Sequence, residues 1–196
     1  MILTKDEQSA SEAAHLLSCG KVGILPTDTV YGFSGIVDVE EKKFLCDEKI
    51  RLIKGRSETK PFIQLISKPE DIYKYSEVEL PEQIVTLWPG PLTVIVPVKK
   101  DLYMAQKTPT VAFRCPGDEW LRKVIGLCNK PIYSTSANRS GQKIIEEIDG
   151  IKSEFEAEVD FIVADGDRKN GVPSTLITIE NGAIKVLRQG AIHLSL

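Results

Sequence analysis

Three cations fall within seven residues of one another: Lys54, Arg56 and Lys60, with Gly55 between the first two. Arginine presents a planar fork that binds phosphate or carboxylate through two hydrogen bonds, and lysine adds a point charge. This spacing favours an anion clamp. The same residues also fit a helix C-terminus, where the helix dipole attracts cations, and the sequence alone leaves both interpretations open.

A second polar group is uncharged. Ser134, Ser136 and Asn138 alternate along the chain, so in an extended segment their side chains share one face. They would supply hydrogen-bond donors and acceptors to a ligand without adding charge. A Ser/Asn-rich turn that caps the next helix explains the same pattern equally well.

Two further groups follow predicted strands. Thr27 and its polar neighbours come after the apolar residues 22–25 and Pro26, which cannot donate to a sheet, so they are expected on a strand-end loop where binding groups are often presented. Arg114 follows an apolar strand and precedes a Pro-Gly turn, so we expect it to point into a strand-end crevice. Ser174 and Arg188 also lie at strand ends, where ordinary polar residues are the simplest interpretation.

The elements that position these groups alternate between strands and helices. We expect strands at 22–25, 62–66, 92–96, 111–114, 132–135, 161–164, 175–179 and 184–187. We expect helices opening with a capping box at 4–7 and ending near Gly20, at 40–53, at 117–125 and from 144 onward, with Pro69 and Pro81 in the first turns of two more. Asn181-Gly182 predicts a hairpin turn. The pattern predicts a single α/β domain, residues 1–196, with a mixed sheet.

The totals narrow the class of protein. A chain of 196 residues with 42% hydrophobic residues can bury one core, and its net charge of −3 gives no global nucleic-acid signal. The four cysteines form no CxxC pair and match no zinc pattern. The N-terminus does not read as a signal peptide, and no apolar run approaches membrane-spanning length. We therefore expect a cytoplasmic protein with reduced thiols and no membrane partner.

Missing motifs restrict the chemistry. The sequence has no GxxxxGK[ST] loop and no GxSxG elbow, and neither His15 nor His193 has a context that suggests a triad or a metal site. Any reaction would then depend on positioning and charge stabilisation. Phosphoryl and nucleotidyl transfer need little more than these, together with magnesium.

Seven segments occur in one order: LPTDTVYG, KGR followed by KP, LWPGPLT, TVAFRCP, STSANRSG, GVPSTL and LRQGAI. In this order they resemble the YrdC/Sua5 family, the L-threonylcarbamoyladenylate synthases, in its short single-domain form. The resemblance implies a twisted mixed sheet flanked by helices around a basic cavity.

The resemblance also implies a reaction. Such enzymes use L-threonine, bicarbonate or CO2, and ATP with Mg²⁺ to make threonylcarbamoyl-AMP and pyrophosphate. A separate threonylcarbamoyl-transfer complex then modifies the tRNA adenosine next to the anticodon. Neither the sequence nor the resemblance identifies protein ligands of the metal.

Roles carry over by position in the matching segments. The resemblance implies catalytic roles for Lys54, Arg56, Ser136 and Asn138. It implies threonine contacts from Thr27, Tyr31, Arg114, Ser134 and Ser174. It implies ATP contacts from Arg56, Lys60, Thr110, Ser136, Ile144 and Arg188.

Two other classes of protein are alternatives. A YciO-like paralogue would act as a binding module for double-stranded RNA or nucleotides, possible partners here being tRNA or double-stranded RNA. The carbamoyl-transfer domain of hydrogenase maturation proteins accompanies zinc-finger cysteines, which this sequence lacks. The K-x-R and S-x-N pairs together favour the enzyme.

Overall fold

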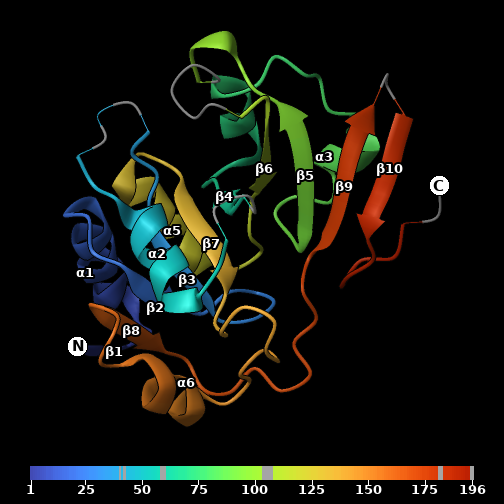
Figure 1. Cartoon of the computed structure of the whole chain (residues 1–196). Coiled ribbons are helices and arrows are strands. Elements are labelled where there is room, and N and C mark those ends of the chain that lie inside the picture. The colour runs from blue at the N-terminus through green and yellow to red at the C-terminus, as the bar shows by residue number, and fades with distance from the viewer. Residues whose placement is uncertain (40, 42, 58–60, 103–107, 181–182, 195–196) are drawn as a thin grey trace.

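A computed structural model describes residues 1–39, 41, 43–57, 61–102, 108–180 and 183–194. Within these residues, ten strands form one sheet in the order β1-β8-β2-β3-β7-β4-β6-β5-β9-β10 (Figure 1). The sheet contains both parallel pairs, such as β4 with β6, and antiparallel pairs, such as β3 with β7. The predicted α/β fold with a mixed sheet is confirmed.

The strands are short. Their bounds are β1 Ile2–Thr4, β2 Gly23–Leu25, β3 Gly32–Ile36, β4 Ile63–Leu65, β5 Leu92–Pro97, β6 Thr110–Arg114, β7 Ile132–Ser136, β8 Phe161–Ala164, β9 Thr175–Glu180 and β10 Ala183–Arg188. The helices are α1 Glu7–Ser18, α2 Cys46–Lys54, the 3-10 helix η1 Pro69–Lys74, α3 Glu82–Val85, α5 Glu119–Cys128 and α6 Ile148–Phe155.

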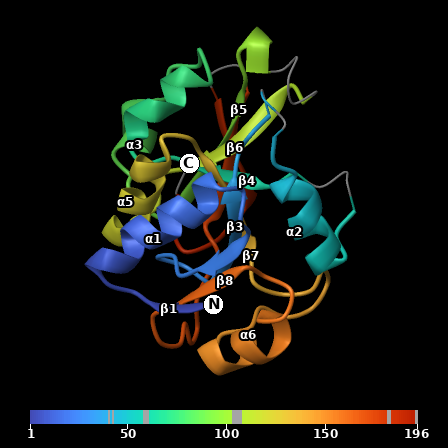
Figure 2. The ribbon, with the colours of Figure 1, turned by 90° about the vertical axis from the view of Figure 1, so that its left-hand side faces the viewer.

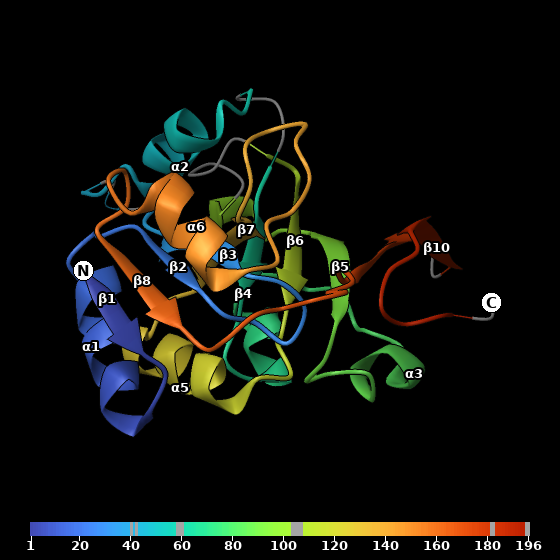
Figure 3. The ribbon, with the colours of Figure 1, turned by 90° about the horizontal axis from the view of Figure 1, so that it is seen from below.

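Helices cover both faces of the sheet. Helix α1 packs against α5 on one side, and α2 packs against β3 from the other (Figure 2). The buried apolar residues form two clusters, one around β2, β3, β7 and β8 and one around β5 and β6. In the view from below, the segment that follows β8 crosses from the first half of the sheet to β9 in the second (Figure 3). The central strands and this crossing segment therefore connect the part of the sheet with the first apolar cluster to the part with the second.

The sequence pattern misses two strands. The first is β3, whose five residues are all buried although two of them are glycines. Glycine lowers strand propensity, and here the tertiary pairing of β3 between β2 and β7 overrides that preference. The second is β1, three residues that pair with β8 at the sheet edge.

Helix boundaries also differ from the prediction. The N-cap of α1 is Asp6, not Thr4: its carboxylate accepts from the Ser9 amide at 2.7 Å, and the Ser9 hydroxyl accepts from the Asp6 amide at 2.8 Å. Helix α2 begins later than expected, α5 runs to Cys128 instead of ending at residue 125, and α6 begins at Ile148 instead of 144.

The end of α2 is the boundary that matters for the site, and there the prediction is confirmed. Gly55 ends the helix in the left-handed conformation, with φ of 61°, which glycine adopts without strain. The Asn181-Gly182 turn lies outside the described residues, although the antiparallel register of β9 and β10 is that of a hairpin. In the part of the chain that is described, no helix is long and apolar enough to cross a membrane.

Candidate functional site

The K-x-R and S-x-N segments lie together, and their residues Lys54, Arg56, Ser136 and Asn138 are called the Lys54 group. Lys54 is the last residue of α2, and its ammonium donates to three oxygens: Ser136 O at 2.5 Å, Asn138 O at 2.7 Å and Asn138 Oδ1 at 3.3 Å. The Ser140 amide donates back to Lys54 O at 2.7 Å. The hydrogen bonds of the Lys54 side chain and one backbone hydrogen bond thus connect the end of α2 to the turn that follows β7. Lys54 and Asn138 are 84 positions apart in the sequence.

Among the described residues, no carboxylate lies beside the charge of Lys54. Its side chain is buried, its three hydrogen-bond acceptors are neutral, and its ammonium lies 5.2 Å from the centre of the Phe33 ring. Burial, and secondly the charge of Arg56, lower the pKa of Lys54 to about 7. All three bonds are formed only by the protonated amine, which has three N–H groups. The site therefore gains from an anionic ligand that keeps this proton in place.

The Ser136–Asn138 pair forms a closed network. The Ser136 hydroxyl donates to Asn138 Oδ1 at 2.6 Å, and Asn138 Nδ2 donates to Arg139 O and Gln142 O at 2.9 and 2.7 Å. Strand β7 ends at Ser136, so Asn138 lies in the turn after it and not on a shared strand face. The segment does not cap a helix either, because α6 begins only at Ile148.

Arg56 lies over an aromatic ring. Its guanidinium carbon is 5.0 Å from the centre of the Phe62 ring, and its terminal nitrogens donate to Pro61 O at 2.9 Å and Thr135 Oγ1 at 3.2 Å. Burial, and secondly the charge of Arg51, lower the pKa of Arg56. Its Nε is buried and has no hydrogen-bond acceptor among the described residues. A buried donor of this kind is rare in folded proteins and often marks a functional position.

A second set of polar groups lies around Arg114; together with its partners Asp28, Thr29 and Gly90 it is called the Arg114 group. Its guanidinium donates to Asp28 Oδ1 at 2.5 Å, Thr29 Oγ1 at 3.0 Å and Gly90 O at 3.2 Å. Its side chain is 6% exposed. Arg114 is therefore buried and is not a solvated charge at the end of a strand, and its partner is a carboxylate of the strand-end loop.

The loop itself is closed by Thr27. The Thr27 hydroxyl donates to Val30 O at 2.7 Å and accepts from the amides of Thr29 and Val30. The Tyr31 hydroxyl donates to Gly166 O at 2.7 Å and accepts from the Asp165 amide at 2.8 Å. Burial raises the pKa of Tyr31. In the structure, Thr27 shapes the loop and Tyr31 anchors the segment after β8.

Ser174 and Arg188 meet beside Arg114. The Ser174 hydroxyl lies 2.7 Å from Thr93 Oγ1, and Arg188 donates to Ser174 O at 2.8 Å. Burial, and secondly the charge of Arg114, lower the pKa of Arg188. The two strand-end residues therefore contact each other, with Ser174 buried and Arg188 exposed at the end of β10.

The remaining predicted residues are less closely tied to these groups. Ser134 is half-buried on β7, and Thr110 is exposed at the start of β6. Ile144 precedes Ile145, whose amide donates to Ala137 O at 3.4 Å, so it lies near the turn after β7. Lys60 lies outside the described residues.

The sequence analysis missed one residue that packs against the Thr27 loop. Arg168 donates to Thr27 O at 3.4 Å and Asp165 O at 2.7 Å, and lies 5.4 Å from the centre of the Tyr31 ring. Nearby, a Cβ on Gly171 would meet Thr29 O at 2.6 Å. The loop-like stretch 165–173 was recognised in the sequence, but nothing in it indicates that it packs on the Thr27 loop.

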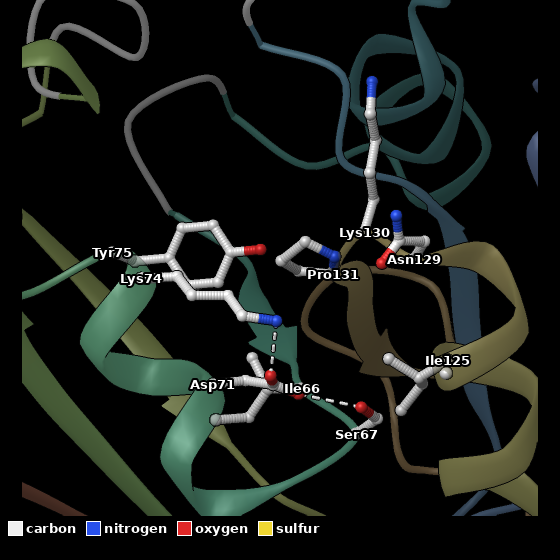
Figure 4. A pocket seen from close by; sticks show the side chains of 10 residues that line it. Ile66, Ser67, Asp71, Lys74, Tyr75, Ile125, Asn129, Lys130 and Pro131 are labelled. Carbon is white, nitrogen blue, oxygen red and sulfur yellow. Dashed lines mark hydrogen bonds and ion pairs between the residues drawn. The ribbon is translucent and has the colours of Figure 1, made fainter.

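One cavity lies apart from these groups. A cavity of about 40 Å³ between η1 and α5 contains the Lys74–Asp71 ion pair, 2.7 Å long, and the Ser67–Asp71 hydrogen bond (Figure 4). It shares no residue with the Lys54 or Arg114 groups.

Among the residues that the structure describes, no cluster of three histidine, cysteine or acidic side chains could hold a metal ion.

Comparison with known proteins gives a consistent picture. A family model described as "Telomere recombination" (Sua5_yciO_yrdC) matches residues 15–190. The threonylcarbamoyl-AMP synthase of Pyrococcus abyssi is 31% identical over 188 residues, which cover 93% of this chain and 54% of that protein. A putative threonylcarbamoyl-AMP synthase of Methanocaldococcus jannaschii is 33% identical, over 88% of this chain and 81% of that protein. This chain thus spans about half the length of the Pyrococcus protein.

Solved structures agree in fold. P. abyssi Sua5 complexed with L-threonine superimposes with a TM-score of 0.84 at 30% identity, over 97% of this chain and 57% of that one. E. coli YciO superimposes with a TM-score of 0.78 at 21% identity, over 97% and 94%. The second likeness is one of fold alone.

Proposed function

Because the chain belongs to the Sua5/YciO/YrdC family, we propose that it is an L-threonylcarbamoyladenylate synthase. It joins L-threonine, bicarbonate or CO2, and ATP into threonylcarbamoyl-AMP and pyrophosphate. The observation that carries the proposal is the direct contact between the two catalytic pairs, in which Lys54 binds both Ser136 and Asn138. A binding module for double-stranded RNA gives no reason for this buried, closed network.

In this proposal ATP binds at the Lys54 group. The Arg56 guanidinium binds the phosphates, and the buried charge of Lys54 adds positive potential. The further ATP contacts are Lys60, Thr110, Ser136, Ile144 and Arg188. Mg²⁺ bound to the ATP phosphates would neutralise part of their charge.

Threonine binds at the Arg114 group, where its carboxylate pairs with the guanidinium. Thr27, Tyr31, Ser134 and Ser174 supply the surrounding shape and polar contacts. This assignment draws on the burial of Arg114 and on the P. abyssi relative, whose structure contains L-threonine.

The chemistry needs a cationic environment. The neutral amine of threonine attacks CO2, and the resulting carbamate, an anion, then attacks the α-phosphate and displaces pyrophosphate. Two anions must approach each other, so fixed cations lower the barrier. Orientation supplies roughly 7–11 kcal/mol at most for well-aligned reactants. Exclusion of water protects the carbamate and the mixed anhydride, which are both labile.

The product would pass to a threonylcarbamoyl-transfer complex that modifies tRNA adenosine next to the anticodon. ATP, threonine and tRNA are all present in the cytoplasm, and we propose that the protein acts there.

The deciding experiment measures pyrophosphate release from ATP and Mg²⁺, with and without L-threonine and bicarbonate. Release that requires both additions, together with the mass of threonylcarbamoyl-AMP in the product, supports the synthase. If ATP binds but no pyrophosphate appears, the acceptor is a different one. If ATP does not bind, the proposal is wrong and the RNA-binding alternative becomes the better one.

A further inference from the structure

Asp28 has no role in the function proposed so far, yet it holds the centre of the Arg114 group. Its Oδ1 accepts from Arg114 Nη2 at 2.5 Å, and its Oδ2 accepts from the Gly117 amide at 2.9 Å. Its side chain is only 17% exposed. The carboxylate therefore bridges the guanidinium and the backbone that leads from β6 into α5, and both of its oxygens are occupied.

The hydrogen bonds of Arg114 leave a defined remainder. A guanidinium has five N–H groups, and three of them go to Asp28, Thr29 and Gly90. Among the described residues, one N–H on each terminal nitrogen is then left without an acceptor. A bidentate carboxylate takes two N–H groups of one guanidinium. Asp28 therefore leaves Arg114 able to bind a second carboxylate.

We infer that Asp28 is a positioning residue for the amino-acid substrate: it fixes the Arg114 guanidinium so that its two remaining N–H groups receive the substrate's carboxylate. The inference rests on the proposed function, because it takes threonine as the ligand of Arg114. Asp28 acts only through Arg114 and touches neither ATP nor the reacting atoms.

Asp28→Asn is the main test, because it keeps the size of the side chain. The amide offers one oxygen where two donors need acceptors, so either Arg114 or Gly117 loses its bond. We expect KM for L-threonine in pyrophosphate release to rise by about tenfold to a hundredfold. KM for ATP, and kcat at saturating threonine, should change less than about threefold.

Asp160→Asn is the matched control. Asp160 also bridges a backbone amide, Val22 N at 2.8 Å, and a cation, Lys49 at 2.6 Å, and is 21% exposed, but it lies far along the sheet from Arg114. This variant should leave both KM values unchanged. An equal rise in both variants would mean that Asp28 has a merely structural role.

A double-mutant cycle separates positioning from stability. If Asp28 acts through Arg114, Asp28→Asn raises KM for threonine no further in an Arg114→Ala background. Independent, multiplying effects would overturn the inference. A fall in KM for Asp28→Asn would also overturn it, because Asp28 would then compete with the substrate for Arg114.

A second variant covers a failure of Asp28→Asn to fold. Thr29→Val removes another anchor of Arg114 without changing charge, and should raise KM for threonine by a few-fold with KM for ATP unchanged. No change in either KM would contradict the inference. If the wild-type protein itself shows no threonine-dependent turnover, the proposed function fails; if it turns over normally and both variants behave like it, only the role of Asp28 fails.

Discussion

The Lys54 and Arg114 groups both bury a cation, but they satisfy it differently. Lys54 is surrounded by neutral oxygens of Ser136 and Asn138, while Arg114 is paired with the carboxylate of Asp28. Accordingly, the pKa of Lys54 falls to about 7. A cation that faces only neutral acceptors keeps its positive potential for an incoming polyanion. A cation paired with a carboxylate loses potential and gains a fixed orientation, which suits a small ligand with one negative charge.

Arg56→Ala should have the largest effect on this contrast. The substitution removes the fork proposed to bind ATP phosphates, so pyrophosphate release should fall by at least about a hundredfold. Circular dichroism should show an intact fold, since the guanidinium is near the surface of the Lys54 group. Turnover close to the wild-type value would show that the phosphates bind elsewhere.

Arg114→Ala should affect threonine and not ATP. We expect KM for threonine to rise by about tenfold to a hundredfold, because a charge-assisted pair is lost. KM for ATP serves as the internal control and should stay within about twofold. A parallel rise in both constants would mean that the two groups do not bind separate substrates.

Lys54→Met tests the unpaired charge through stability. Between pH 7 and 10.5 the unfolded chain binds the Lys54 proton and the folded chain does not, so the free energy of unfolding of the wild type rises with pH in this window. Relative to Lys54→Met, the rise should approach about 1.4 kcal/mol per pH unit at most. Urea titrations at several pH values measure it. A difference between the two proteins that does not vary with pH would show that the charge of Lys54 is compensated.

Gly171→Ala should give the smallest effect. The new Cβ would lie 2.6 Å from Thr29 O, so the loop that holds Arg114 must shift. We expect a rise of a few-fold in KM for threonine. Gly126→Ala is the control, since its Cβ meets Ser67 at an ordinary 3.8 Å and alanine favours the helix by about 0.5–1 kcal/mol. Equal KM values for the two variants would contradict a packing role for Gly171.

The alternation of strands and helices, the end of α2 at Gly55 and the polar residues at strand ends can be predicted from local sequence. Local preferences decide these features: Gly55 adopts φ of 61° without strain, and apolar runs such as Phe161–Ala164 pack as strands. Ordered motifs also indicated the family. None of these signals depends on contacts between distant segments.

The pairing of the polar residues, in contrast, depends on contacts that form when the chain folds. Asp28 lies 86 positions from Arg114, and Lys54 lies 84 from Asn138, so no local pattern links them. Strand β3, with its two glycines, exists because β2 and β7 flank it. Burial then decides the charge states, since desolvation acts on Lys54 only once α2 and the turn after β7 have closed around it.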